Sequence, residues 1–177
     1  MKDRPIEIRY ASHRDAELLA EIGATTFYDS YANDIAADDI ADYLEASFGT
    51  EKQAAELADR SGCFLIAEVD GNTAGYARLL ESEAPPDVTP QAIELQRIYV
   101  RQEYIGRGIG AALMRACLAE ARQRGFEAIW LGVWERNPRA IGFYKKWGFE
   151  VAGVHAFQMG KETQTDVLLW RSAAPQE

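Results

Sequence analysis

The chain has 177 residues, of which 47% are hydrophobic and 27% are charged. This balance is typical of a folded domain and excludes a disordered or low-complexity protein. The net charge of −9 disfavours nucleic acid as a partner, because DNA- and RNA-binding proteins present a basic surface. No segment is long and apolar enough to span a membrane, and the first residues lack the apolar stretch of a signal peptide. We therefore expect a soluble, cytoplasmic protein of one domain, residues 1–177, with a flexible tail at 172–177.

Charge is unevenly distributed along the chain. Residues 1–90 contain 7 Lys and Arg against 19 Asp and Glu, a net charge of −12, whereas residues 91–177 contain 12 against 9, a net charge of +3. The first half can therefore receive a cation and the second an anion. Cys63 and Cys117 lie in apolar segments without metal-ligand spacing, which disfavours a metal site or a disulfide scaffold.

The first half of the chain carries signals for three helices and a hairpin. Ser12 and Asp15 form a capping box, and the turn at 70–72 lies between two apolar runs. The elements expected in chain order are an edge strand at Ile6–Tyr10, a helix through Leu18–Ile22, a helix at about Asp38–Phe48, a helix from Thr50 to about Arg60, and a hairpin of Cys63–Val69 and Ala74–Leu80. The three prolines of 83–90 predict a surface loop.

The second half alternates strands and helices. A strand at Gln91–Val100 is followed by a glycine-rich turn and a helix that ends at Gly125. The nearly continuous apolar run Phe126–Trp134 predicts a central strand covered on both faces. The remaining expected elements are a short helix from Asn137-Pro138 to Gly148, a strand at Phe149–Phe157 and a strand at Thr165–Arg171.

The glycine-rich turn is the first candidate binding site. Gly106, Gly108 and Gly110 occupy alternate positions between a strand and a helix, so that several backbone N–H groups can converge on one phosphate. The alternative is a tight turn that merely requires small residues. The spacing GxGxG falls short of the dinucleotide fingerprint GxGxxG, which argues against a Rossmann dehydrogenase.

A wider set of motifs resembles the GNAT superfamily of acetyl-CoA-dependent N-acetyltransferases over about residues 5–171. It comprises Ile98-Tyr99-Val100, the glycine turn, Asn137, Phe143-Tyr144 and Gly148-Phe149. The resemblance implies an α/β (α+β) fold, with a mixed, mostly antiparallel sheet of six to seven strands flanked by helices and splayed between the fourth and fifth strands. Further motifs, among them Ile129–Glu135 and Gln164-Thr165-Asp166, are similar to the bacterial PaiA-type spermidine/spermine acetyltransferases.

The resemblance also implies where acetyl-CoA binds. In the family the turn holds the CoA pyrophosphate, and the preceding strand pairs with the pantetheine arm through its backbone. The implied cofactor-binding residues are Ile98, Tyr99, Val100, Ile105, Gly106, Arg107, Gly108, Ile109, Gly110, Ala111, Asn137 and Tyr144. Ile105 stands where the family usually has Gln or Arg. Because the neighbouring contacts are made by backbone amides, we expect binding to survive this departure.

Transfer of an acetyl group to an amine requires a neutral nucleophile, a polarised carbonyl and a proton for the leaving thiolate. Tyr144 matches the family tyrosine that supplies this proton; the alternative is a core aromatic residue. Glu94 matches a catalytic glutamate of some members; the alternatives are a solvated carboxylate or a group that binds the substrate cation directly. Asn137 can contact the cofactor, cap the helix before Pro138, or do both. A lone histidine such as His155 is more often structural.

The expected acceptor is a small amine, with a polyamine first among the candidates. The acidic and aromatic residues of the first half suit a cation. The candidate substrate-binding residues are Tyr28, Tyr31, Asp38, Asp39 and Trp134. A solvated acidic helix face is the alternative. Two other functions stay open: acetylation of a peptide, protein or amino-group antibiotic, and a CoA-binding regulatory module with little turnover. The sequence also leaves open a homodimer.

Overall fold

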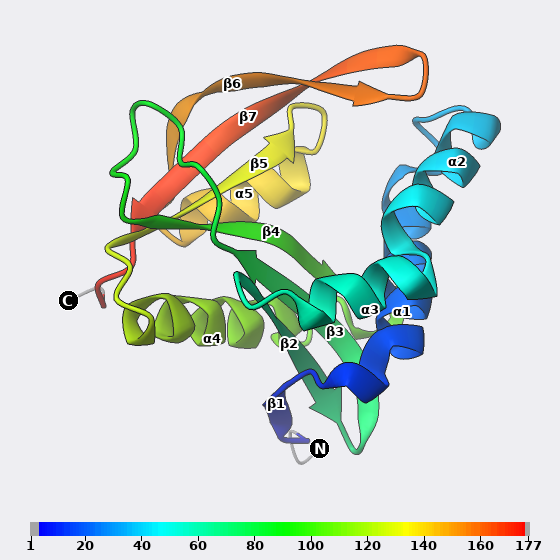
Figure 1. Cartoon of the computed structure of the whole chain (residues 1–177), viewed down its shortest axis with the longest axis horizontal. Coiled ribbons are helices and arrows are strands. Elements are labelled where there is room, and N and C mark those ends of the chain that lie inside the picture. The colour runs from blue at the N-terminus through cyan, green and yellow to red at the C-terminus, as the bar shows by residue number, and fades with distance from the viewer. Residues whose placement is uncertain (1–3, 176–177) are drawn as a thin grey trace. The chain divides into compact units, whose positions relative to one another are not determined.

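The computed structural model describes residues 4–175, which form the strands and helices drawn in Figure 1. Their bounds are β1 Ile6–Tyr10, the 3-10 turn η1 His13–Asp15, α1 Ala16–Tyr31, α2 Ala37–Phe48, α3 Thr50–Ala58, β2 Gly62–Val69, β3 Asn72–Leu80, β4 Ala92–Val100, the 3-10 turn η2 Gln102–Tyr104, α4 Ile109–Gln123, β5 Ala128–Trp134, α5 Pro138–Lys146, β6 Glu150–Met159 and β7 Glu162–Ser172. The chain folds into two compact units. The first comprises the chain up to Leu79 and Arg97–Cys117, and the second comprises Leu80–Gln96 and the chain from Leu118 onward.

The strands follow the order β1-β2-β3-β4-β5-β7-β6 in one sheet. β1 is antiparallel to β2, and β7 is antiparallel to both β5 and β6, whereas β4 and β5 are parallel. The β4–β5 pairing covers only Ala92–Glu94 against Ala128–Trp130, although both strands continue beyond it. The expected mixed, mostly antiparallel sheet of six to seven strands, splayed between its fourth and fifth strands, is therefore confirmed, with seven strands present.

The first unit is organised by the local signals that the sequence carries. Both hydrogen bonds of the Ser12–Asp15 capping box are present. The β2–β3 hairpin turns at Asp70 and Gly71, whose φ values of 51° and 76° are those of a tight hairpin turn. Capping and turn geometry depend on residues within a few positions of one another, which explains why these predictions are correct.

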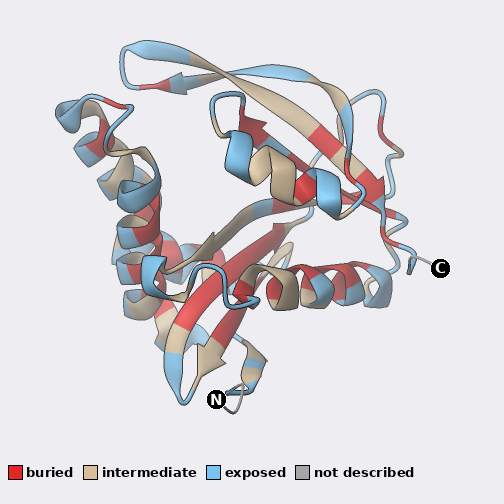
Figure 2. Ribbon diagram, turned by 180° about the vertical axis from the view of Figure 1, so that it is seen from behind, coloured by how far each residue is buried: buried red, intermediate tan, exposed pale blue. Residues whose placement is uncertain are grey.

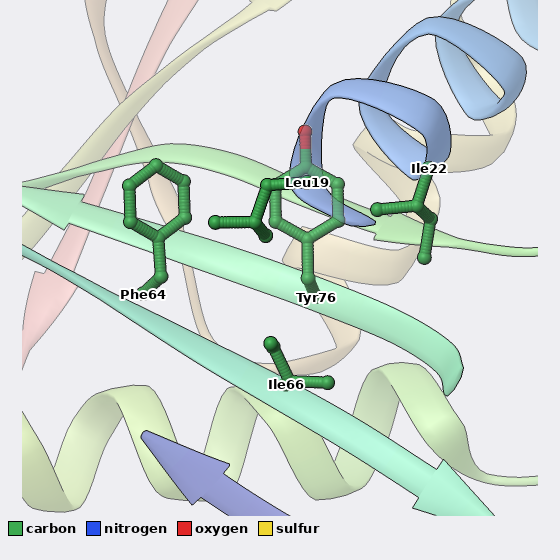
Figure 3. Close-up of a cluster of buried hydrophobic side chains, with 5 residues drawn as sticks. All are labelled: Leu19, Ile22, Phe64, Ile66 and Tyr76. Carbon is green, nitrogen blue, oxygen red and sulfur yellow. The ribbon is translucent and has the colours of Figure 1, made fainter. Parts of the chain in front are cut away.

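The core of the first unit lies between α1 and the β2–β3 hairpin. Leu19 and Ile22 are one helical turn apart on α1, and Phe64 and Ile66 alternate on β2. Tyr76 of β3 completes this cluster, and all five side chains are buried (Figure 3). The apolar stripe of a helix and the apolar face of two strands thus bury one another.

A buried ion network joins α3 to the strands of the first unit. Both oxygens of Glu56 accept from Arg97, at 2.8 and 3.0 Å, and Glu56 also pairs with Arg78 at 3.1 Å. Glu56 is 7% exposed, and the side chains of Arg78 and Arg97 are 5% and 10% exposed. The guanidinium of Arg97 lies 5.1 Å from the centre of the Phe48 ring. This network therefore holds β4 at Arg97, the residue before Ile98-Tyr99-Val100.

The second unit is built on β5, β7 and β6. α5 lies alongside β5 (Figure 1), and Arg171 of β7 donates to the carbonyl of Trp147 beyond the end of α5, at 2.7 Å. β6 and β7 are longer than predicted and reach Met159 and Glu162. Most of the outer half of this hairpin is exposed (Figure 2), so its sequence shows no apolar alternation.

The segment after β7 begins in ordered contacts. The N–H of Ala173 donates to the carbonyl of Glu127 at 2.8 Å, and its carbonyl accepts from Arg122 at 2.7 Å. Ala173 is buried, and residues 176–177 lie outside the described part of the chain. Among the helices that residues 4–175 form, none has the length and hydropathy needed to cross a membrane.

Candidate active site

The turn between β4 and α4 has a backbone that favours glycine. Gly106 and Gly108 have φ values of 82° and 83°, a left-handed conformation that other residues adopt only with strain. A Cβ on Gly106 would meet no atom within 4 Å, and one on Gly108 would meet the Ile6 side chain at 3.8 Å. Backbone conformation rather than lack of space therefore requires glycine here. Gly110 differs, because it already lies in α4.

The start of α4 supplies the donors of this turn. The N–H of Ala112 bonds to the carbonyl of Gly108 at 3.0 Å and closes the first helical turn. The N–H groups of Ile109, Gly110 and Ala111 are those that a helix start leaves without a carbonyl of a preceding turn. Such groups, at the positive end of the helix dipole, bind anions. The residues present therefore fit a diphosphate such as that of CoA.

The charged side chains around the turn have different surroundings. Arg107 is exposed and lies over the ring of Tyr104, 5.4 Å from its centre. Arg101 instead pairs with Glu21 of α1 and donates to the carbonyl of Thr73 at 2.9 Å. Ile105 is 40% exposed and places an apolar side chain at the surface. Arg101 is thus held by its ion pair with Glu21, whereas Arg107 forms no ion pair with the described residues.

The end of β4 packs closely on β3 and α4. A Cβ on Gly75 of β3 would lie 2.6 Å from the carbonyl oxygen of Tyr99 and 3.1 Å from the Ile109 side chain. Gly75 is therefore needed to keep the Ile98–Val100 segment in place. The sequence alone does not reveal this role, because an isolated glycine within a strand gives only a weak signal of close backbone approach.

Tyr99 turns its ring toward the other tyrosines of the first unit. Its ring centre lies 5.8 Å from that of Tyr76. Burial raises the pKa of the Tyr99 phenol well above its usual value, and the nearby phenols of Tyr31 and Tyr76 raise it further. Tyr99 therefore keeps its proton at neutral pH and can act there only as a neutral phenol. The backbone of this segment remains the part expected to meet the pantetheine arm.

The candidate acceptor residues of the first unit lie on α1 and α2. Tyr28 is 52% exposed, whereas Tyr31 is half-buried with its ring 4.6 Å from that of Phe27. Asp38 and Asp39 occupy the first turn of α2, where the helix dipole favours carboxylates. Asp38 is exposed and Asp39 is half-buried. The aromatic residues thus lie at the end of α1, and the acidic residues lie at the start of α2, the next helix in the chain.

The second unit holds the candidate proton donor. Tyr144 lies in α5 and is buried, with its ring 5.4 Å from that of Phe143 and 5.6 Å from that of Phe149. Asn137 caps α5: its side-chain oxygen accepts from the N–H of Ala140 at 3.2 Å. The predicted cap before Pro138 is therefore confirmed, and the amide nitrogen of Asn137 is the part of this side chain that the cap does not use.

The second unit also holds Glu94 and Trp134. The hydroxyl of Ser82 donates to Glu94 Oε2 at 2.9 Å, which orients the carboxylate from the loop before β4. Trp134 is buried at the end of β5, and its Nε1 donates to Gln164 Oε1 at 2.8 Å. The sequence gives no sign of either contact, because Ser82 and Gln164 lie 12 and 30 positions from their partners.

Replacement of Gly108 by Val is expected to weaken CoA binding by about 5- to 10-fold, on the order of 1 kcal/mol. A β-branched residue cannot hold φ near 83° without strain, so the amides of the turn would no longer converge. Calorimetric titration with CoA measures the change. Gly71→Val is the matched control, because Gly71 has a similar φ of 76° in the β2–β3 turn. Equal CoA affinity of wild type and Gly108→Val would exclude the phosphate cradle.

Comparison with known proteins gives consistent matches over most of the chain. The acetyltransferase (GNAT) family profile matches residues 27–149. An uncharacterised N-acetyltransferase of Lactobacillus delbrueckii subsp. lactis, encoded in the pepI 3′ region, is 33% identical over 93% of this chain and 95% of its own length. A streptothricin acetyltransferase of Streptomyces lavendulae is 32% identical over 71% of this chain and 64% of its own length.

Solved structures reproduce the fold. The PaiA N-acetyltransferase of Thermoplasma acidophilum, whose crystal structure contains coenzyme A, superposes with a TM-score of 0.78 over 95% of this chain and 99% of its own. The two sequences are 24% identical. At this identity the likeness establishes a common fold.

Proposed function

The chain belongs to the GNAT family of acetyltransferases, and from that premise we propose that it transfers the acetyl group of acetyl-CoA to a primary amine of a small cationic acceptor, with polyamines such as spermidine as the leading class. Acetyl-CoA supplies the activated acetyl group as a thioester. The proposal is that the acceptor amine attacks it directly while both are bound.

The proposal of a cationic acceptor rests on the acidic surface of α1, α2 and the turn between them. Four of its aspartates are exposed and Asp39 is half-buried. The set, here called the acidic face, is Asp29, Asp34, Asp38, Asp39 and Asp42. None of these carboxylates forms an ion pair with any of residues 4–175. Their charge is thus available to a cation from solution, and such attraction favours polyamines over monoamines.

On this proposal the cofactor is held by backbone groups of the first unit. The N–H groups of Ile109, Gly110 and Ala111 bind the pyrophosphate, and Arg107 adds a nearby positive charge. The backbone of Ile98–Val100 aligns the pantetheine arm, and one of its N–H groups polarises the thioester carbonyl. Backbone donors do not depend on side-chain identity. Acetyl-CoA binding is therefore compatible with Ile105 at a position where the family usually has Gln or Arg.

Three side chains of the second unit complete the proposed chemistry. An amine of pKa near 10 is about one part in a thousand neutral at pH 7, and removing its proton costs roughly 4 kcal/mol. Glu94, oriented by Ser82, takes this proton directly or through water. Tyr144 gives a proton to the departing thiolate. Asn137 donates its amide to the cofactor while its oxygen caps α5.

A second acceptor class has support from a relative. The streptothricin acetyltransferase of Streptomyces lavendulae acts, by its name, on an amino-group antibiotic. Such antibiotics are also cationic, so the acidic face suits them as well. Acetylation of a peptide amine and a regulatory CoA-binding role are the remaining alternatives. A homodimer and a cytoplasmic location stay predictions; sedimentation of the purified chain checks the former.

Release of free CoA on a panel of amines tests the proposed function. The panel contains spermidine, spermine, a monoamine of similar length, streptothricin, an aminoglycoside and a lysine peptide. We expect the highest kcat/KM on a polyamine. Preference for an antibiotic or the peptide would identify the acceptor as that class instead. CoA binding without turnover of any amine would favour the regulatory role.

Neutralisation of the acidic face is expected to raise KM for spermidine several-fold. The variant is Asp38→Asn, Asp39→Asn and Asp42→Asn together, and Kd for acetyl-CoA should not change. In the wild type, kcat/KM for spermidine should fall as salt rises, since exposed charges are screened within about 10 Å at 0.1 M ionic strength. In the variant this salt dependence should flatten. The measurement is steady-state kinetics at low and high salt.

A matched control removes the same charge elsewhere. Glu7, Glu83 and Asp87 are exposed acidic residues outside the acidic face, and their joint change to Gln, Gln and Asn lowers the net negative charge equally. If this control shifts KM as much as the acidic-face variant, overall charge rather than a defined surface attracts the acceptor.

A further inference from the structure

Gly132 leaves the backbone of β5 exposed in a strand that is otherwise covered. It is the one exposed residue of β5, whose other six residues are buried or half-buried. A glycine inside a strand has no side chain to pack, and it often marks a place where another group approaches the backbone closely. The apolar run that predicted a strand covered on both faces therefore has a gap at this position.

The carboxylate of Asp166 lies at this gap. A Cβ on Gly132 would be 3.3 Å from Asp166 Oδ2, so the carboxylate lies over the bare backbone of the glycine. Asp166 is half-buried, yet its carboxylate forms no hydrogen bond or ion pair with any side chain in the described range 4–175. Burial raises the pKa of Asp166, while the nearby His155 opposes this rise. Partial burial disfavours the charged form of this carboxylate, so a cation that pairs with it would offset the lost hydration.

The strand register shows which residues surround Asp166. It pairs with Trp134 on β5 and with His155 on β6, and side chains of directly paired residues project on the same face. The indole of Trp134 is fixed by its hydrogen bond to Gln164. Of these two ladder neighbours, His155 is the one with an ionisable side chain. An aromatic wall, a bare glycine and a carboxylate thus meet on one sheet face.

This face is distinct from the one that α5 covers. Ile129 pairs with Arg171, which donates to the carbonyl of Trp147 after α5, so the residues Ile129, Leu131 and Val133 project toward the helix side. On the opposite face Trp130 packs with Val88 of the loop before β4. The loop therefore closes the Trp130 end, and the exposed position on β5 is Gly132.

We propose that Asp166 binds an ammonium group of the acceptor over the bare backbone of Gly132, with the indole of Trp134 as the wall for the attached alkyl chain. This inference rests on the proposed function and deepens it: the second unit itself contains a specificity-determining carboxylate. A carboxylate provides the charge, an indole favours cations and alkyl groups, and the missing Cβ provides the room. The ligand class is therefore an alkylamine with at least two amino groups.

Spermidine binding to the full chain, measured by calorimetry in the presence of CoA, tests the proposal. Asp166→Asn keeps the shape and removes the charge, so Kd for spermidine should rise roughly tenfold or more. Gly132→Ala puts a methyl group 3.3 Å from Asp166 Oδ2 and should weaken spermidine similarly. Kd for CoA should stay unchanged in both. Glu150→Gln, an exposed carboxylate on neighbouring β6, is the matched control and should bind spermidine as wild type does.

Thermal stability separates ligand binding from a structural role. The pKa of Asp166 is higher in the folded chain than its ordinary value, so the folded state binds this proton more tightly and loses stability as pH rises through the folded pKa. At pH 7 the ionised carboxylate is a cost, and Asp166→Asn should raise Tm. The gain should vanish at a pH below the ordinary Asp range. A lower Tm for Asp166→Asn at pH 7 would make the carboxylate structural and overturn the proposal.

The outcomes distinguish this inference from the proposed function. If wild type acetylates spermidine but Asp166→Asn binds it equally well, the proposed function stands and the inference is wrong. If spermidine binds through Asp166 but no amine on the panel is acetylated, the inference stands and the proposed function is wrong. If the enzyme acetylates both amines, steady-state kinetics provide a further test. Asp166→Asn should raise KM for spermidine far more than KM for a monoamine, because the monoamine has no second ammonium group.

Discussion

Tyr144→Phe is expected to lower kcat about 10- to 1000-fold while Kd for acetyl-CoA changes little. The substitution keeps the ring between Phe143 and Phe149 and removes only the hydroxyl. If this hydroxyl protonates the leaving thiolate in the wild type, the thiolate must leave without a proton in the variant. The chemical step is then the step that slows. Single-turnover rates with the preferred amine from the panel measure this step directly.

Tyr10→Phe is the control for this prediction, because Tyr10 is an exposed tyrosine on β1. It should leave kcat unchanged. A single-turnover rate of Tyr144→Phe within a factor of two of wild type would show that Tyr144 serves packing alone. A parallel rise in Kd for acetyl-CoA would instead assign the hydroxyl to cofactor binding.

Glu56→Gln is expected to lower the free energy of unfolding by about 3–5 kcal/mol. The substitution keeps the size of the side chain but leaves the buried guanidinium groups of Arg78 and Arg97 without the carboxylate that bridges them. An uncompensated buried charge costs far more than the ion pair contributes. Urea unfolding at neutral pH, with the slope checked for two-state behaviour, measures the change.

The same network offers its own control. Asp59 also faces Arg78, at 3.9 Å, but its side chain is largely exposed. Asp59→Asn should shift the unfolding midpoint little, because solvent screens the exposed Asp59 carboxylate and its contact with Arg78 is long. Because Arg97 precedes Ile98–Val100, Glu56→Gln should also weaken CoA binding under conditions where the protein is folded. Equal midpoints for the two variants would show that Glu56 does not stabilise the buried arginines.

Prediction from the sequence worked best where the determinants are local. The Ser12–Asp15 capping box, the hairpin turn at Asp70-Gly71 and the Asn137 cap each depend on residues within a few positions. The ends of β6 and β7 were predicted less well. Their outer residues are exposed, so ladder hydrogen bonds rather than apolar alternation extend the hairpin from Phe157 to Met159 and from Thr165 back to Glu162.

By itself the sequence determined the strand, glycine turn and helix of the proposed cofactor site, because positive φ and a helix start are properties of neighbouring residues. It could not determine which distant side chains meet. Glu56 reaches Arg97 41 positions away, and Asp166 reaches the Gly132 backbone only because β7 pairs with β5 in one register. A shift of one residue in that register would turn Asp166 to the opposite face. Only the tertiary structure decides register, because it depends on which faces of the strands are buried together.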